Sequence, residues 1–244
     1  EVLSLSGLRL WPLEGTGDRY WLDSGQPAWL GLEVVNYEAD TLEVTLANAS
    51  LPAGWALTYD GDPDWSKSIP AGASASLNVT VTPPQDAPAA QTTWLQLTAS
   101  SGTLQARFDA NLTVNQQFGL ALALPDRFAL LGNVESAVKF NITNAGNGPD
   151  LLELNLSGVW VTDETQLLSL DPFETREIAV LANSGLVEPG TASALAVSVR
   201  SLTAAESGQT VAQSGTLTLV ASGLLLAPGS VEMLELAPDE SDSF

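Results

Sequence analysis

The feature of this sequence that most constrains its fold is the repetition of short segments in which apolar and polar residues alternate. In the stretch from Leu51 to Pro84, for example, Leu77, Val79 and Val81 share one phase. Side chains of a β-strand point alternately to its two faces, so this pattern predicts a strand with one buried face. Such segments recur at intervals of about 8–12 residues, and no stretch has a convincing helical period. The sequence therefore predicts an all-β, antiparallel Greek-key sandwich.

About seven such strands are expected in the first half of the chain, given this spacing. The residues from Trp55 to Ile69 are predicted to form a loop with no strand of its own. The strands are predicted at 1–13 (broken at Gly7), 20–22, 27–36, 42–46, 77–81, 92–99 and 104–114.

The second half repeats this order, with strands predicted at 118–124, 137–143, 151–156 and 216–221. Pairing Asn36 with Asn144 gives an offset of 108 residues, whereas pairing Leu77 with Ile178 gives 101. A shrinking offset is expected when a duplicated module loses residues from its loops. We therefore predict two tandem immunoglobulin-like β-sandwiches, 1–115 and 116–222, joined by a very short linker. Residues 223–244 are predicted to form a C-terminal strand and an acidic tail.

Composition excludes several classes of function. The 244 residues include 29 acidic and 8 basic ones, which gives a formal net charge of −21. Such a field repels nucleic acids and anionic membrane surfaces, because both are polyanionic, and it suits salty surroundings. Histidine and cysteine are absent, which removes most transition-metal sites and the usual catalytic triads. No apolar run approaches the ~18 residues that a membrane span requires. We therefore expect no enzyme activity, no nucleic-acid partner and no membrane span.

Three short elements carry a family resemblance: an asparagine turn after the second strand, a Pro-Gly-Trp element, and a Pro-Ala-Gly turn before an alternating strand. They stand at Asn36 and Asn144; at Pro52, Gly54 and Trp55, of which the second half keeps Gly158 and Trp160; and at Pro70 and Gly72, where the second half has Asp171 and Pro172. These elements resemble the NPCBM-associated domain, an Ig-like module found beside sugar-binding domains of α-galactosidases, and the CARDB modules of archaeal and bacterial surface proteins. The resemblance implies an Ig-like fold and a spacer or adhesive role, and it transfers no catalytic residues.

Tryptophan is unevenly distributed. Trp55 and Trp160 hold matching positions and are expected to fill the core between the sheets. The other five lie in the first module, and we take them as candidate ligand or interface residues: Trp11, Trp21, Trp29, Trp65 and Trp94.

Strand parity points Trp29 and Trp94 outward. Because their strands normally lie in different sheets, the two are not expected to form one site. Outward tryptophans either stack on sugar rings or bury against a protein partner, and the second reading is favoured because no coplanar pair is evident. A third interpretation is that loops, the N-terminal segment or the second module cover these rings.

Three carboxylates alternate along the predicted loop, at Asp60, Asp62 and Asp64. Oxygen ligands at every second position suit Ca²⁺, the one cofactor that the sequence suggests. The Gly and Glu positions of an EF-hand are missing, however, and a solvated acidic turn has the same sequence. The solvated turn is the favoured interpretation.

Five Asn-x-Ser/Thr sequons are candidate glycosylation sites, at Asn48, Asn78, Asn111, Asn141 and Asn155. The last four fall on the outward phase of predicted strands, where a glycan would leave the core undisturbed. Asn and Thr also alternate with apolar residues on any exposed β-face, so both readings stay open.

These features favour a non-catalytic structural or adhesion module, a stalk or assembly unit, of an extracellular or cell-envelope protein from an archaeon or bacterium. Protein partners or self-association are expected. One alternative is a filament or surface-layer subunit that assembles by β-strand addition through segments 2–10 and 224–236. Another is a carbohydrate-binding accessory domain that uses tryptophans of the first module.

Overall fold

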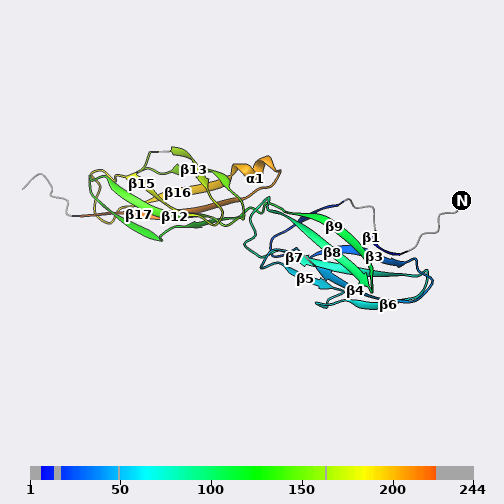
Figure 1. Ribbon diagram of the computed structural model, residues 1–244. Coiled ribbons are helices and arrows are strands. Elements are labelled where there is room, and N and C mark those ends of the chain that lie inside the picture. The colour runs from blue at the N-terminus through cyan, green and yellow to red at the C-terminus, as the bar shows by residue number, and fades with distance from the viewer. Residues whose placement is uncertain (1–6, 14–17, 49, 163, 224–244) are drawn as a thin grey trace, which may run out of the picture.

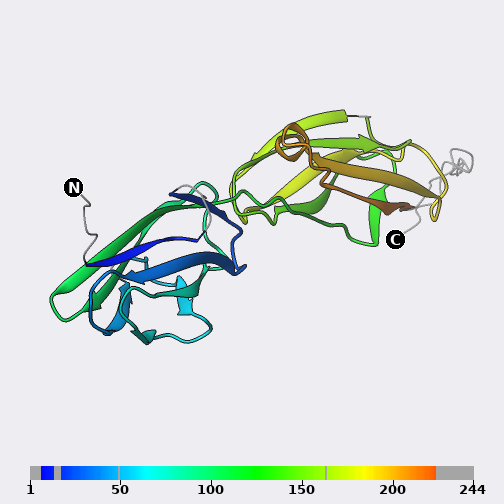
Figure 2. The ribbon, with the colours of Figure 1, turned by 90° about the vertical axis from the view of Figure 1, so that its right-hand side faces the viewer.

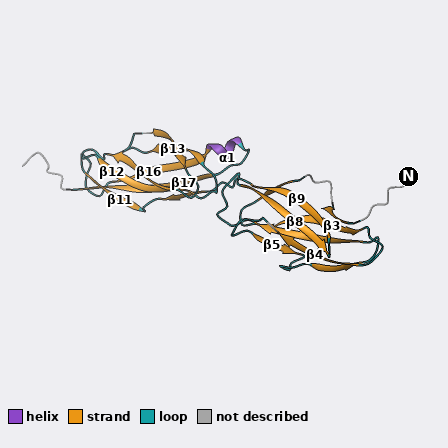
Figure 3. Ribbon diagram, viewed as in Figure 1, coloured by secondary structure: helices purple, strands orange, loops and turns teal. Residues whose placement is uncertain are grey.

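The computed structural model describes residues 7–13, 18–48, 50–162 and 164–223. They form two β-sandwiches that follow one another along the chain (Figures 1 and 3). The view turned by 90° also shows them end to end, with a short connection between them (Figure 2). The predicted all-β, Ig-like fold class is confirmed. The residue boundaries predicted for the modules stay a prediction.

The described residues of the first module form nine strands in two sheets. One sheet has the order β1-β3-β7-β5, and the other has the order β2-β9-β8-β4-β6. The strands are β1 (Leu8–Pro12), β2 (Arg19–Leu22), β3 (Ala28–Asn36), β4 (Leu42–Asn48), β5 (Ala56–Tyr59), β6 (Ser66–Ile69), β7 (Ser74–Thr82), β8 (Thr92–Ser101) and β9 (Leu104–Val114).

The second module repeats this plan with eight strands, in the sheet orders β10-β12-β15 and β11-β17-β16-β13-β14. The strands are β10 (Leu120–Ala123), β11 (Arg127–Leu131), β12 (Ser136–Asn144), β13 (Asp150–Ser157), β14 (Glu164–Leu170), β15 (Thr175–Ala182), β16 (Ala192–Ser201) and β17 (Ala212–Ser222), and the helix α1 spans Leu202–Glu206.

The N-terminal segment of each module is divided between the two sheets. In the first module β1 pairs antiparallel with β3, whereas β2 crosses to the other sheet and pairs parallel with β9. In the second module β10 pairs with β12, and β11 pairs parallel with β17. Both sheets of each sandwich are therefore tied to the same stretch of chain.

Each module buries its own apolar cluster between its two sheets. In the first, Leu30 and Leu32 of β3 stand opposite Val79 and Leu77 of β7, and all four are buried. The alternation seen in the sequence is thus the inward phase of a sandwich strand. Trp55 and Trp160 are partly buried and pack against the two clusters, rather than being enclosed by them.

The structure contains several elements that were not predicted from the sequence: β5, β6 and α1, and in the second module β11, β14 and β16. Strands β5 and β6 lie where only a loop was expected. They could not be predicted, because each has four residues, which are too few to show a period. In the second module the counterpart of β5 is reduced to a single bridge, between Val161 and Ala182. Helix α1 was also not predicted; its N-cap is Ser201, whose hydroxyl accepts a hydrogen bond from the Ala204 N–H. The C-terminal strand expected after 223, and with it the strand-addition segment 224–236, lies outside the described residues.

One buried asparagine occupies the same place in each module. The Asn36 side chain donates to the carbonyl oxygens of Asp40, Ile69 and Pro70, at 2.8, 2.9 and 3.1 Å, and accepts from the Glu38 N–H at 2.8 Å. It therefore joins the end of β3, in one sheet, to the end of β6, in the other.

The repeat keeps every one of these bonds. Asn144 donates to the carbonyls of Gly148, Leu170 and Asp171, at 2.9, 3.3 and 3.0 Å, and accepts from the Gly146 N–H at 2.9 Å. The asparagine turn noticed in the sequence is thus a clamp between the sheets, since one carboxamide satisfies several buried carbonyls at once.

Replacing Asn144 by alanine should therefore lower the free energy of unfolding of the second module by about 2–3 kcal/mol, because buried carbonyls lose their donor. Denaturant titration measures this loss, and amide hydrogen exchange should locate it in β12 and β14, the two strands whose ends the clamp joins. Asn141→Ala, three residues away on the exposed face of β12, is the matched control. Equal stabilities for the two variants would contradict the role given to the clamp.

Candidate functional site

The most heavily bonded polar side chain between the modules is Asn147. It lies in the β12–β13 loop of the second module and is 2% exposed. Its carboxamide donates to the carbonyl oxygens of Ala87 and Asn115, at 3.1 and 3.0 Å, and to the Ser24 hydroxyl at 3.4 Å. Its side-chain oxygen accepts from the Gln117 N–H at 2.7 Å.

The backbone of Asn147 makes two further bonds across the same junction. Its N–H donates to the Gln117 carbonyl at 3.2 Å, and its carbonyl accepts from the Ala89 N–H at 2.9 Å. The Gln117 side chain adds bonds to Ser24 on the first module. The connection between the modules is therefore held by a saturated hydrogen-bond network, which we call the joint.

Two glycines flank Asn147, and both are needed for the close approach. A Cβ at Gly146 would overlap the Gln117 carbonyl oxygen, and a Cβ at Gly148 would lie 2.8 Å from the Gln116 side chain and 2.9 Å from Cβ of Ala89. From the sequence alone, this loop is recognisable only as a copy of the turn at Asn36. The available signal was its difference from that turn, since the two glycines and Asn147 have no counterparts in the first copy.

Four of the five candidate tryptophans lie at the surface. Trp29, Trp21, Trp94 and Trp11 are 69%, 67%, 50% and 39% exposed. Trp65 is the exception: only 8% exposed, it belongs to the core of the first module. The prediction that Trp65 is a ligand or interface residue is therefore wrong, because its ring fills the core of the first module and is not free to bind a ligand. Strand parity could not show this, since no strand was predicted beside it.

Two of the exposed rings share one face. On the sheet β2-β9-β8, Trp94 stands opposite Asn111, and Trp21 stands opposite Thr113. Since residues two apart on a strand point to the same side, Trp21 and Trp94 project from the same outer face, on either side of β9. Trp29 lies on β3 in the other sheet, so it does not form one site with Trp94, as expected.

Trp11 is held by polar neighbours. Its indole N–H donates to Glu33 at 3.0 Å, and the Arg9 guanidinium lies 5.8 Å from its ring centre. The Ser74 hydroxyl also donates to Glu33, and the hydrogen bonds from Ser74 and Trp11 hold the pKa of that carboxyl below its usual value. Trp11 is thus anchored against its own sheet, whereas the face that holds Trp21 and Trp94 is open.

The acidic loop does not assemble a metal site. Asp60 adopts φ = 52°, and its carboxylate accepts a hydrogen bond from the Asn78 N–H at 2.8 Å. Among the described residues, no group of three or more Asp, Glu, His or Cys is placed to hold a metal ion. The structure thus does not bring Asp60, Asp62 and Asp64 together as a ligand cluster.

The sequons differ in their surroundings. Asn78 and Asn141 are exposed, whereas Asn111 and Asn155 are half-buried. Asn155 is engaged by Glu153 and Thr165, and Asn111 accepts from the Thr113 hydroxyl at 3.2 Å. The side chain of Asn48 lies outside what the structure describes.

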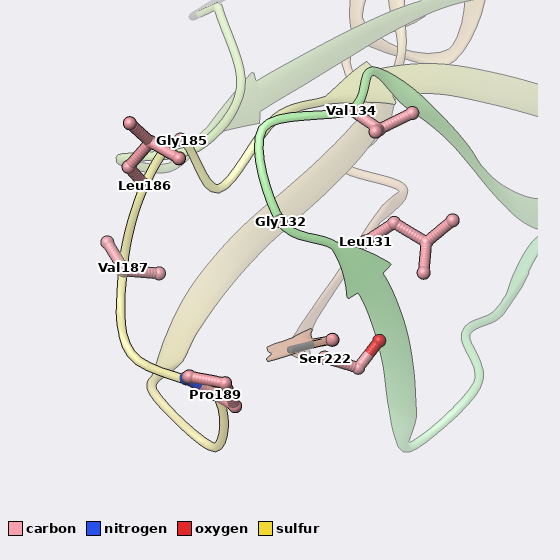
Figure 4. Close-up of a pocket in the computed structure, with 9 residues that line it drawn as sticks. Leu131, Gly132, Val134, Gly185, Leu186, Val187, Pro189 and Ser222 are labelled. Carbon is pink, nitrogen blue, oxygen red and sulfur yellow. The ribbon is translucent and has the colours of Figure 1, made fainter. Parts of the chain in front are cut away.

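An apolar hollow of about 270 Å³ lies at the end of the second module that faces away from the joint. Figure 4 shows the loop that follows β11 and the loop that follows β15 bordering it. Its lining includes Leu131, Val134, Leu186, Val187 and Pro189. Leu131, Val134 and Leu186 are 57%, 48% and 79% exposed, so apolar surface is concentrated here.

The comparisons with known proteins agree with the resemblance found in the sequence. Residues 22–101 match the family described as the NPCBM-associated, NEW3 domain of alpha-galactosidase. No curated protein matches the chain.

Solved structures also resemble the chain at low sequence identity. One is a protein of unknown function from Porphyromonas gingivalis W83 (13% identity, 89% of this chain and 100% of that one, TM-score 0.33). Another is CBD12 from CALX1.2 (10% identity, 87% and 99%, TM-score 0.35), and a third is the titin domains z1z2 in complex with telethonin (12% identity, 90% and 95%, TM-score 0.33).

The matched domain and the β-sandwich architecture fit a non-catalytic accessory or binding module. The one helix in the described part of the chain has five residues, too few to cross a membrane.

The different positions of the tryptophans lead to a stability test. Trp65→Ala should destabilise the first module by about 3–5 kcal/mol, because it leaves a cavity in the core. Trp29→Ala, which removes a ring of the same size from the surface, should change stability by no more than about 0.5 kcal/mol. Chemical denaturation followed by circular dichroism measures both. Similar losses in the two variants would show that Trp29 is covered by some part of the protein.

Proposed function

We propose that this chain is a semi-rigid spacer in a cell-surface or secreted protein, which holds the segments on either side of it at a fixed distance and orientation. The joint at Asn147 is the observation that carries the proposal. Consecutive domains normally move relative to one another unless their interface restrains them, and a large hydrophobic interface is the usual restraint. Here the contact is dense in hydrogen bonds, and the connecting residues Gln116 and Gln117 take part in it themselves.

The energetics of the joint support limited motion. If the modules swung apart, the Asn147 carboxamide and the carbonyls of Ala87 and Asn115 would have to find water in place of one another. The net gain from each hydrogen bond is only about 1 kcal/mol, but several must break together. The docked arrangement is therefore expected to dominate, and the chain to behave as one short rod.

The match to an α-galactosidase-associated domain supports an accessory role beside other domains. The net charge of −21 supports a soluble module that does not adhere to polyanionic surfaces.

The absence of cysteine from the sequence makes the joint directly measurable. Spin labels on Ser68→Cys of β6 and Ser169→Cys of β14, both exposed positions, report the distance between modules by pulsed electron paramagnetic resonance. The unmodified joint should give one narrow distance distribution. Adding Asn147→Ala should broaden it, because two buried carbonyls lose their donors.

Asn141→Ala, exposed on the same module, is the control and should leave the distribution narrow. A broad distribution without any substitution at the joint would overturn the spacer function. An unchanged distribution in Asn147→Ala would show that other contacts hold the modules.

A second candidate function is carbohydrate binding by the outer face of β2, β9 and β8. The observation that favours it is the pair of exposed rings, Trp21 and Trp94, on one face. Between them lie polar side chains of Asn111 and Thr113. Aromatic faces can pack on the apolar side of a sugar ring, while neighbouring amides and hydroxyls bond its hydroxyl groups.

Loss of either ring should then abolish binding to a neutral glycan array. Trp21→Ala and Trp94→Ala are both expected to lose binding. Trp29→Ala, equally exposed but on the other sheet, should bind as the unmodified chain does. Binding that is lost only in Trp29→Ala, or no binding to any glycan, would exclude this face as a sugar site.

A further inference from the structure

The end of the first module that receives Asn147 has a counterpart at the end of the second module that faces away from the joint. In the first module this surface, which we call the seat, is formed by residues 23–26, 83–91 and 115–117. In the second module the corresponding segments are 131–134, 184–191 and 222–223, and they border the apolar hollow of Figure 4.

Backbone hydrogen bonds establish this correspondence. The Gly25 N–H donates to the Pro83 carbonyl at 3.1 Å, and in the same place the Asn133 N–H donates to the Gly185 carbonyl at 2.9 Å. Both donors have positive φ, 69° for Gly25 and 55° for Asn133. The β2–β3 and β11–β12 loops therefore follow the same path.

A second backbone hydrogen bond of the seat also has a counterpart in the second module. The Ala90 N–H donates to the Val114 carbonyl at 2.9 Å, and the Gly190 N–H donates to the Ala221 carbonyl at 2.8 Å. Here too both donors have positive φ, 60° and 90°. The first seat holds the loop that carries Asn147, whereas the second seat is the hollow.

The two seats differ in chemistry. Where the first has Asp23 and Ser24, the second has Leu131 and Gly132. The Ala89 N–H, which bonds the Asn147 carbonyl in the first seat, is replaced by Pro189, which has no N–H to donate. The second seat thus lacks the Asp23 and Ser24 side chains and the Ala89 donor, and it presents exposed leucines in their vicinity.

We propose that the end of the second module that faces away from the joint docks the end loop of another β-sandwich module of this kind. In that loop an apolar side chain stands in the position that Asn147 holds in the first joint. The contact would bury Leu131, Val134 and Leu186, whose present exposure is otherwise unfavourable. The proposal goes beyond the spacer function, since it extends the rod by a further module.

The corresponding loop of the first module lacks the two glycines that the first joint requires, which argues against head-to-tail stacking of identical copies. By their bonds to Asn36 and Asn144, Glu38 corresponds to Gly146, and Asp40 corresponds to Gly148. In the first joint, side chains at these two positions would have no room against Gln116, Gln117 and Ala89. The seat is in addition flanked by the carboxylates of Glu135 and Glu188, which repel an acidic loop.

The test gives the full chain a loop that fits. Tyr37→Ala, Glu38→Gly, Ala39→Leu and Asp40→Gly together create the proposed docking loop on the first module. In molar salt, which screens the net charge, this variant should associate head to tail. Analytical ultracentrifugation should show its weight-average mass rising about twofold or more with concentration, while the unmodified chain stays monomeric.

Two further variants decide whether the seat is responsible. Leu131→Ser with Leu186→Ser, added to the loop variant, should restore the monomer. In the reverse design, Leu131→Asp, Gly132→Ser and Pro189→Ala make the seat polar. This seat should then bind the loop variant more tightly when position 39 carries Ala39→Asn than when it carries Ala39→Leu, with the other three loop substitutions kept. The proposal would be overturned if the loop variants stayed monomeric with the natural seat and also with the polar seat. It would also be overturned if oligomers persisted after Leu131 and Leu186 were replaced by serine. Circular dichroism of each variant verifies that it is folded.

Discussion

The buried asparagine carboxamide is the interaction on which this structure depends. A carboxamide offers two donors and an acceptor on a short stem, so it can satisfy backbone groups from several segments that meet at one point. Asn36 and Asn144 use this capacity within a module, where each ties one sheet to the end of a strand in the other. Asn147 uses it between modules, three residues from Asn144. A single loop thus closes the second sandwich and connects it to the first.

The features that the two modules share and those that they do not have different roles. Shared features, the clamp asparagines and the inward strand phases, build the sandwiches. Unshared features lie at the surface and at the ends: the open face with Trp21 and Trp94, the joint loop, and the apolar seat. The unshared features are the ones expected to carry function, because function resides in sites added to a fold that the two modules share.

Much of the fold could be predicted from the sequence, because strands such as β7, β8 and β9 bury alternate residues over five to seven positions. β5, β6 and α1 could not, since four or five residues do not define a period. The outward direction of Trp29 and Trp94 followed from parity. The pairing of Trp21 with Trp94 required the parallel register of β2 on β9, which depends on tertiary contacts. The joint depends on groups about 30 to 120 residues apart along the chain, and no local pattern reports these.

The parallel pairing of β2 with β9, and of β11 with β17, has a mechanical consequence. These strands lie near the start and the end of their modules and run in the same direction. Tension applied along the chain would pull each pair in opposite senses along its own axis. The interstrand hydrogen bonds, which lie across that axis, would then carry the load together instead of opening one at a time. The connection at Asn147 lies between these two strand pairs along the chain. A pulling force would therefore pass through all three, and the weakest of them would break first.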